Sequence, residues 1–429
     1  MSGFAALAPF RSRSYRFQWP ADLCTAWALE METIILGWYV LVESGSVLLL
    51  TVFGALQFVG TLLSPLIGVL ADRLGLRNVL AGMRLAYAVC ASVILALAVS
   101  GRLDPTLVLI VAAVSGLVRP SDIGMRSALV GATVPAVHLV SAMSISRTTM
   151  DSAKVGGALA GAGFMAAFGM APAYVVITGI YVTGALLTLL VEGGRRVPHA
   201  AAVTGTGVVT GAGAGAKPPA RPSPWRDLKE GIVYVWRTPQ LLAAMSVAAL
   251  VNLTAFPLTG GLMPYIARDI FHLDQQGLGW MVASFSCGAF IGSVSLSVFG
   301  TRVQPARMMM ATCVIWYFCL LGFAFATTLP MALLLLLAAG LAQSISMITL
   351  AIMLLRTSEE RFRGRIMGVR MLAIYPLPLG LLIAGAMIPV IGFRATATVL
   401  VVTGLVLTLA ITMGWRSHLV HREAVGNAR

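Results

Sequence analysis

Three acidic residues lie in one apolar stretch near the N-terminus, where a charged side chain is costly. Asp22, Glu30 and Glu32 fall within residues 18–41, and Glu30 lies near the middle. Desolvation favours the protonated form of a carboxyl group, so such a group can take up and release a proton near neutral pH. Glu30 and Glu32 are about 200° apart around a helix. We expect Glu30, in preference to Glu32, to face a polar interior and carry a proton. The alternative is a structural ion pair with an arginine.

Two later apolar stretches also carry charge. Arg119 and Asp122 lie within residues 106–128, and Arg119 needs an acidic partner in the first stretch or at Asp122, because arginine stays ionised. Asp151 and Lys154 lie three residues apart within 139–167, on one helical face. These charged residues either form structural ion pairs between helices or take part in proton and substrate binding.

The whole chain has the composition of a membrane protein. Of its 429 residues, 58% are hydrophobic and 11% charged, with a mean hydropathy of +0.90. Unbroken apolar runs of roughly 20 residues predict membrane-spanning helices and not the alternating strands of a barrel. The sequence therefore predicts an all-α membrane protein with twelve spans: 18–41, 47–70, 79–100, 106–128, 139–167, 171–191, 241–265, 276–299, 306–327, 331–355, 366–390 and 393–415.

The net charge of +14 follows the membrane topology and does not indicate nucleic-acid binding. With a cytoplasmic N-terminus, the predicted external loops hold only Arg102, Arg268 and Arg394, three of the 30 basic residues. The positive-inside rule then places both termini in the cytoplasm.

A polar interruption divides the spans six and six. We expect an N-terminal half at 1–192, a linker at 193–240, a C-terminal half at 241–416 and a cytoplasmic tail at 417–429. The middle of the linker is rich in Gly, Ala and Pro. Its final part, 225–237, places Arg226, Lys229 and Arg237 beside aromatic residues, which predicts an amphipathic helix on the inner leaflet.

One short loop between the second and third spans has a distinctive pattern. It contains Gly68, Asp72, Arg73, Gly75 and Arg77. The pattern resembles the loop signature of the major facilitator superfamily, Gly-x-x-x-Asp-Arg-x-Gly-x-Arg, at every fixed position. The resemblance implies a transporter with two six-helix pseudo-symmetric halves in the cytoplasmic membrane, working by alternating access.

The resemblance also implies a partner for this loop. In the superfamily the loop docks against span 11, where Arg363 and Arg365 stand at the amino end. A weaker copy of the loop, without the aspartate, lies at 300–307. Residues 10–19, 231–241 and 360–368 resemble bacterial exporters of the enterobactin-exporter type.

In this superfamily spans 1, 4, 7 and 10 line the central cavity. Spans 7 and 10 hold polar, uncharged candidates for substrate contact: Asn252, Thr254, Tyr265, Gln343 and Ser346. A cavity that is charged on one side and neutral on the other suits a small amphiphilic solute, drug-like or siderophore-like.

We therefore predict a monomeric, proton-coupled exporter with a small-molecule substrate and the lipid bilayer as its partners. The alternatives are an importer or uniporter of a small metabolite, a lipid or lysolipid flippase, and a membrane scaffold. The five cysteines and five histidines show no metal-ligand spacing, and no nucleophile–base pair or phosphate loop is evident. We expect no enzymatic activity, cofactor, metal or nucleic-acid partner.

Overall fold

The computed structural model describes residues 8–192, 224–299, 304–359 and 362–414, and all of its regular elements there are helices. The first half comprises α1 (Arg13–Ser44), α2 (Val47–Leu56), α3 (Ser64–Leu74), α4 (Leu76–Val99), α5 (Pro105–Thr133), α6 (Ala136–Phe168) and α7 (Met170–Leu189). The remainder comprises α8 (Pro224–Arg237), α9 (Pro239–Thr254), α10 (Phe256–Thr259), α11 (Met263–Tyr265), α12 (Gln275–Phe299), α13 (Pro305–Ala324), α14 (Leu329–Thr357), α15 (Arg363–Leu372) and α16 (Pro376–Gly414).

Interruptions explain why the helices do not match the twelve predicted spans one to one. A 3₁₀ turn, Val59–Leu63, separates α2 from α3 within span 2, and a π turn, Ile266–Ile270, ends span 7 after α11. Helix α16 contains the end of span 11 and span 12 as far as Gly414, divided by Gly392 at φ +78°. With these breaks counted, the all-α architecture of twelve crossing segments is confirmed.

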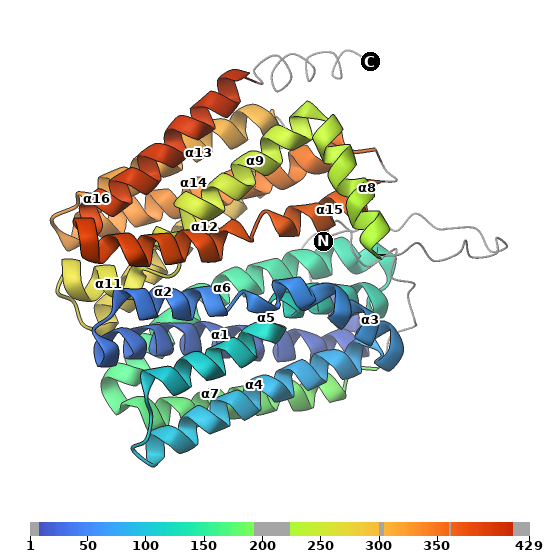
Figure 1. The fold of residues 1–429 in the computed structure, drawn as a ribbon. Helices are drawn as coiled ribbons and strands as arrows, with labels where there is room; N and C mark the ends of the chain where they lie inside the picture. The colour runs from blue at the N-terminus through green and yellow to red at the C-terminus, as the bar shows by residue number, and fades with distance from the viewer. Residues whose placement is uncertain (1–7, 193–223, 300–303, 360–361, 415–429) are drawn as a thin grey trace.

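The helices form two bundles that lie side by side (Figure 1). Helices α1–α7 form one bundle and α9–α16 the other, and they meet through α2 against α16, α6 against α12, and α1 against α11. One end of the molecule, here called the linker end, carries α8, α15 and the turn between α3 and α4. The opposite end, the far end, carries α11.

The two bundles are joined at the far end. Arg268 Nη1 donates to the carbonyl oxygen of Leu41, 2.9 Å away, at the end of α1. Close packing of α2 on α16 continues the contact, because a Cβ built on Gly54 would lie 3.2 Å from the side chain of Leu381. This end is therefore closed by direct contact between the halves.

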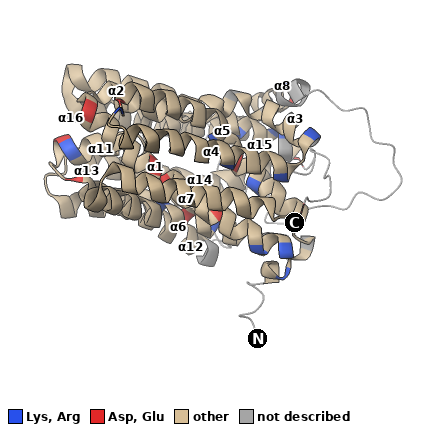
Figure 2. Ribbon diagram, turned by 90° about the horizontal axis from the view of Figure 1, so that it is seen from below, with Lys and Arg blue, Asp and Glu red and all other residues tan. Residues whose placement is uncertain are grey.

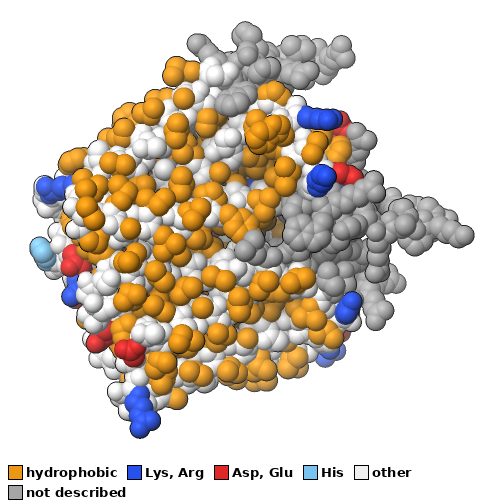
Figure 3. All heavy atoms as spheres, viewed as in Figure 1, with side chains coloured by type: hydrophobic (Ala, Val, Ile, Leu, Met, Phe, Trp, Pro, Cys, Tyr) orange, Lys and Arg blue, Asp and Glu red, His pale blue; other side chains and the backbone are white. Residues whose placement is uncertain are grey.

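The outer surface matches a bilayer environment. Hydrophobic side chains cover the sides of the bundles between charged groups at the two ends (Figure 3). Lysine and arginine gather mainly at the linker end (Figure 2). Within the described residues, eight helices are long and apolar enough to cross a membrane, and two shorter apolar helices accompany them.

The contact between α12 and α14 depends on two glycines. A Cβ on Gly288 would overlap the carbonyl oxygen of Leu337, and one on Gly340 would overlap that of Phe285. We expect Gly340→Ala to destabilise the protein by about 1–3 kcal/mol, the usual cost of overpacking, measured as a lower midpoint of thermal unfolding in detergent. Gly163→Ala is the control, since a Cβ there meets open space. Equal midpoints for the two variants would contradict the prediction.

Candidate functional site

Arg119 lies at the middle of α5 and reaches toward α1 and α2. Its Nη1 donates to Thr33 Oγ1 at 3.0 Å and to Gln57 Oε1 at 2.5 Å. Both partners are neutral, and no described carboxylate bonds to Arg119, although we expected one in span 1 or at Asp122. The positive charge of this half-buried guanidinium is therefore not cancelled by a direct ion pair within the described part of the chain.

Glu30 and Glu32 lie in different environments. Glu32 is 8% exposed, and its Oε2 accepts a hydrogen bond from the hydroxyl of Tyr181 on α7 at 2.7 Å. Glu30 is half-buried, and its carboxylate forms no hydrogen bond with a described residue. A Cβ built on Gly157 of α6 would lie 2.8 Å from the Cβ of Glu30, so this side chain emerges beside α6.

The position of α1 relates Glu30 to the boundary between the bundles. Helix α1 packs on both α2 and α6, and each of those helices packs on the second bundle. Glu30 and Thr33 are three residues apart and so share a side of α1. Thr33, Gln57 and Arg119 are joined by hydrogen bonds at mid-depth, and Glu30 lies on the same side of α1 as Thr33. We call these four residues the mid-depth group.

A second group of charges is buried nearer the linker end of the first bundle. Asp22 forms an ion pair with Arg84 of α4, and Asp122 forms one with Arg126 one turn later in α5. All four residues are at most 4% exposed. Arg126 Nη1 also donates to the carbonyl oxygen of Asp22 at 3.4 Å, which links the two pairs. We call these four residues the buried quartet.

Neutral side chains extend the buried quartet to a further helix. Arg84 also donates to the hydroxyl of Thr188 on α7. Gln18 Nε2 donates to the carbonyl oxygen of Arg126 at 3.1 Å, and Thr133 donates to Gln18 Oε1 at 3.2 Å. The quartet thus joins α1, α4, α5 and α7, and its four formal charges sum to zero.

The charged residues of α6 are less enclosed. Arg147 Nε lies 3.2 Å from Asp151 Oδ2, and the Arg147 side chain is 66% exposed while that of Asp151 is 8% exposed. Lys154 is exposed and forms no ion pair among the described residues. Asp151 is therefore neutralised within its own helix.

The predicted substrate residues of the second bundle lie in different environments. Thr254 shares a 2.8 Å hydrogen bond with Tyr317 of α13, and Ser346 donates to the carbonyl oxygen of Met309 of α13 at 3.2 Å. Both therefore face the interior of this bundle. Gln343 is half-buried at the middle of α14.

Asn252 and Tyr265 belong to the broken span formed by α9–α11. The Asn252 amide donates to the carbonyl oxygen of Ala248 at 2.8 Å, within its own helix, so its own Oδ1 is left as a possible acceptor. The ring of Tyr265 lies 6.1 Å from that of Phe393, centroid to centroid, at the far end.

The predicted gating loop forms a tight turn between α3 and α4. Gly75 adopts φ +87°, a conformation that favours glycine, and Gly68 is buried. Arg73 is exposed, whereas Arg77 Nη1 donates to the carbonyl oxygen of Val191 at 3.3 Å. The side chain of Asp72 lies outside the described part of the structure.

The proposed docking partners of this loop are partly described. Arg365 Nη1 donates to Glu230 Oε2 of α8 at 2.7 Å. Arg365 thus engages the linker helix, which the sequence did not lead us to expect. The side chain of Arg363 lies outside the described part, so its contact with Asp72 stays a prediction.

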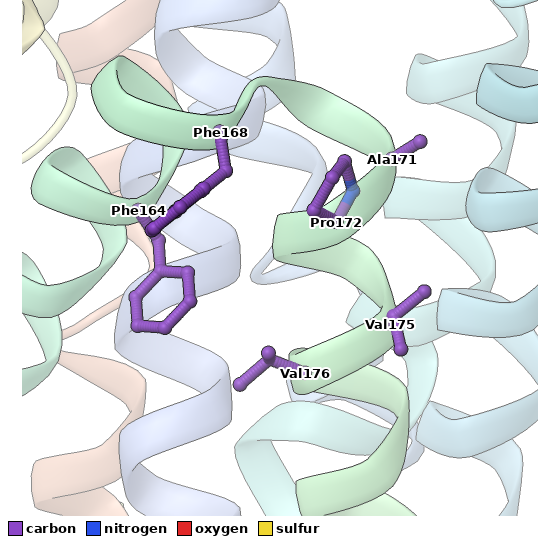
Figure 4. A pocket seen from close by; sticks show the side chains of 6 residues that line it. All are labelled: Phe164, Phe168, Ala171, Pro172, Val175 and Val176. Atoms are coloured by element: carbon purple, nitrogen blue, oxygen red, sulfur yellow. The ribbon is translucent and has the colours of Figure 1, made fainter.

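Other possible sites offer little chemistry. A crevice between α6 and α7 is lined only by apolar residues (Figure 4): Phe164, Phe168, Ala171, Pro172, Val175 and Val176. The described residues contain no group of three or more His, Cys, Asp or Glu side chains placed to hold a metal ion. The mid-depth group therefore remains the best candidate for transport chemistry.

Several members of these groups, and Tyr181, the partner of Glu32, did not emerge as site candidates from the sequence. Arg84 is the single charge in its predicted span, and Arg126 stands four residues after Asp122. The sequence pattern alone could therefore have indicated both as buried charges. Gln57 and Tyr181 are ordinary polar residues in apolar segments, and no sequence pattern distinguishes them as site residues.

The family comparison covers nearly the whole chain. The family model described as "Major Facilitator Superfamily" matches residues 23–259 and 245–427.

Among curated proteins, the multidrug efflux pump Tap of Mycobacterium tuberculosis (strain ATCC 25618 / H37Rv) is 29% identical over 185 residues, 42% of this chain and 43% of Tap. Tap of Mycolicibacterium fortuitum is 29% identical over 169 residues, 39% of this chain and 41% of that protein. The chain thus matches less than half the length of these relatives.

Solved transporters share the fold at low sequence identity. The nucleoside transporter NupG aligns with a TM-score of 0.69 and 12% identity, covering 94% of this chain and 98% of NupG. A bacterial homologue of the human lysosomal transporter Spinster aligns with a TM-score of 0.68 and 13% identity, covering 93% and 96%. At these identities the alignments establish the fold alone.

The pair of Asp22 and Arg84 offers a test of the buried quartet. Asp22→Asn leaves the Arg84 guanidinium buried without its counter-charge, which costs about 3–5 kcal/mol. We expect a much lower midpoint of thermal unfolding for the purified variant. Glu192→Gln is the control, because Glu192 and Arg13 are exposed and 3.9 Å apart, where a pair is worth little. Similar midpoints for Asp22→Asn and the wild type would contradict a stabilising role.

Proposed function

The chain belongs to the Major Facilitator Superfamily, and we propose that it is a proton-coupled exporter of small amphiphilic solutes. Membership makes it a multi-pass membrane transporter of small molecules and not an enzyme. The proposal adds a coupling ion, a direction and a class of solute. It also places the linker end, with both termini, at the cytoplasmic face of the inner membrane.

The observation that carries the proposal is the setting of Glu30. Glu30 is half-buried, and its carboxylate forms no hydrogen bond with a described residue. The same face of α1 carries Thr33, which accepts a hydrogen bond from Arg119. Glu32, in contrast, already accepts a hydrogen bond from Tyr181 in a closed environment. A carboxyl group that exchanges protons must reach water in at least one conformation, and Glu30 meets this condition better.

Protonation of Glu30 has a consequence for the solute. An ionised Glu30 attracts the cationic or polar end of a solute, whereas a protonated Glu30 has no charge to offer it. Binding of a proton and binding of the solute therefore compete at one carboxylate, as proton-driven export requires. The mechanism needs no cofactor.

The second bundle would supply the neutral side of the cavity. Gln343 lies at the middle of α14, and Asn252 lies near the middle of the broken span 7. Transporters of this kind bind substrates near the bilayer midplane, between the two halves. A solute with one polar or charged end and an apolar body suits this combination. Thr254 and Ser346 face α13 and are not assigned to the solute.

Export is favoured by the partial similarity to Tap, which is described as a multidrug efflux pump. The resemblance of three sequence segments to enterobactin-type exporters supports the same direction and a drug-like or siderophore-like solute. Closure at the far end, through Arg268 and Leu41, then corresponds to a conformation sealed on the external side.

Replacing Glu30 tests the proton coupling. In everted membrane vesicles that hold a proton gradient, we expect Glu30→Gln to abolish proton-driven transport of ethidium and similar amphiphilic dyes, because an amide cannot release a proton. Dye movement down its own gradient should persist. Dye fluorescence and a pH-sensitive probe report the two fluxes.

Glu32→Gln is the matched control, since it changes a carboxylate two residues away that is bonded to Tyr181. It should retain coupled transport. Wild-type coupling in Glu30→Gln, at equal amounts of inserted protein, would refute the assignment of Glu30.

The gating loop gives a separate prediction. Asp72→Asn should insert normally but transport dye more slowly, because the favourable interaction of a carboxylate with the amino end of a helix is lost. Initial rates in vesicles, normalised to the amount of protein, measure the effect. Glu192→Gln, which removes an exposed carboxylate outside the loop, is the control. A normal rate for Asp72→Asn would exclude the gating role.

A further inference from the structure

Helix α8 has one face fixed to the C-terminal bundle. The ring of Tyr234 stacks on that of Phe362, with centroids 4.3 Å apart, and Glu230 pairs with Arg365 of α15. Gly231 lies against Val369 and Arg365, at distances where a Cβ would already be crowded. α8 is therefore held against α15 by stacking, charge and close packing.

The opposite face of α8 is exposed and apolar at its centre. A turn of 100° per residue places Lys229, Ile232, Val233, Trp236 and Arg237 on this side of the helix. Trp236 is 72% exposed, and Ile232 and Val233 are 40% and 41% exposed. These five residues form what we call the outer face of α8.

The outer face carries uncompensated positive charge. Lys229 and Arg237 are both exposed, and neither forms an ion pair with another described residue. They stand two helical turns apart and line, with Val233, Tyr234 and Phe362, a groove along α8. Glu230 also borders the groove, but its carboxylate is engaged by Arg365.

The position of α8 brings this face to the edge of the bilayer. The helix lies across the linker end of the bundle instead of along the spans, and Pro239 begins α9 two residues after it ends (Figure 1). Tryptophan and basic side chains are favoured at such an interface, where an apolar ring meets lipid and a cation meets phosphate.

We propose that the outer face of α8 is a binding surface for anionic phospholipids of the adjoining leaflet. Trp236, Ile232 and Val233 enter the interfacial layer, and the groove between Lys229 and Arg237 holds negatively charged headgroups. Charge complementarity selects these lipids over zwitterionic ones. Because the other face is fixed to α15, bound lipid holds the entrance of span 11 at a set depth.

Bromine quenching of tryptophan tests the proposal on the full-length protein. The protein is reconstituted in phosphatidylcholine vesicles in which either phosphatidylglycerol or an equal amount of phosphatidylcholine carries brominated acyl chains. The contribution of Trp236 is the difference between the wild type and Trp236→Phe. We expect brominated phosphatidylglycerol to quench this contribution more strongly.

Paired charge removal tests the recognition itself. The excess quenching should disappear in Lys229→Ala/Arg237→Ala and persist in Arg307→Ala/Arg356→Ala, which removes two exposed arginines from the same end of the molecule. Native mass spectrometry of both double variants should show fewer bound phosphatidylglycerol molecules only for the first. It also reports whether each variant is folded.

Three results would overturn the proposal. Equal quenching by the two lipids would remove the selectivity for anionic headgroups. The absence of any quenching of Trp236 would place the outer face in water or against another protein. Displacement of the lipid by soluble glycerol phosphate would identify a site for free phosphate compounds. None of these outcomes depends on transport, so they leave the proposed function untouched.

Discussion

The cost of burying charge within a membrane bundle is the constraint that organises this molecule. Asp22, Arg84, Asp122 and Arg126 are almost fully enclosed, yet each lies in direct contact with an opposite charge. Removing one partner would leave the other as an unpaired charge in a medium of low polarity. The ion pairs of the buried quartet therefore restrict the rotation of α1 against α4 and α5. In the observed rotation, Glu32 meets Tyr181 while Glu30 emerges beside α6.

The cores of the two bundles are stabilised by different interactions. The first combines an apolar core with buried ion pairs, whereas the described core of the second is packed from apolar and aromatic side chains such as Trp316 and Phe323. Neutral hydrogen bonds like that between Thr254 and Tyr317 add to it. Each bundle is thus internally well determined, and the close contacts between them lie at the far end. Two bodies of this kind can tilt against one another without loss of their own cores, as alternating access requires.

Sequence reasoning predicts the helices well and their partners poorly, for a physical reason. Apolar runs long enough to span a bilayer are a local property, so the twelve segments are visible without a structure. The pairing of Asp22 with Arg84 joins residues 62 positions apart, and that of Glu32 with Tyr181 joins residues 149 apart. Helix rotation decides both, and no local pattern records it. The i,i+4 pair of Asp122 and Arg126 is the exception, since one helix fixes its geometry.

The linker helix changes how the gating loop must be understood. Arg365 is expected to meet Asp72, and this contact stays a prediction because the side chain of Asp72 lies outside the described part of the structure. The Arg365 guanidinium contacts Glu230 of α8 and lies 5.4 Å from the ring centroid of Phe362. α8 therefore fixes α15 in place, and a carboxylate of the loop would be favourably placed at the amino end of α15. The gating loop is thus proposed to act on a helix whose position the linker helix sets.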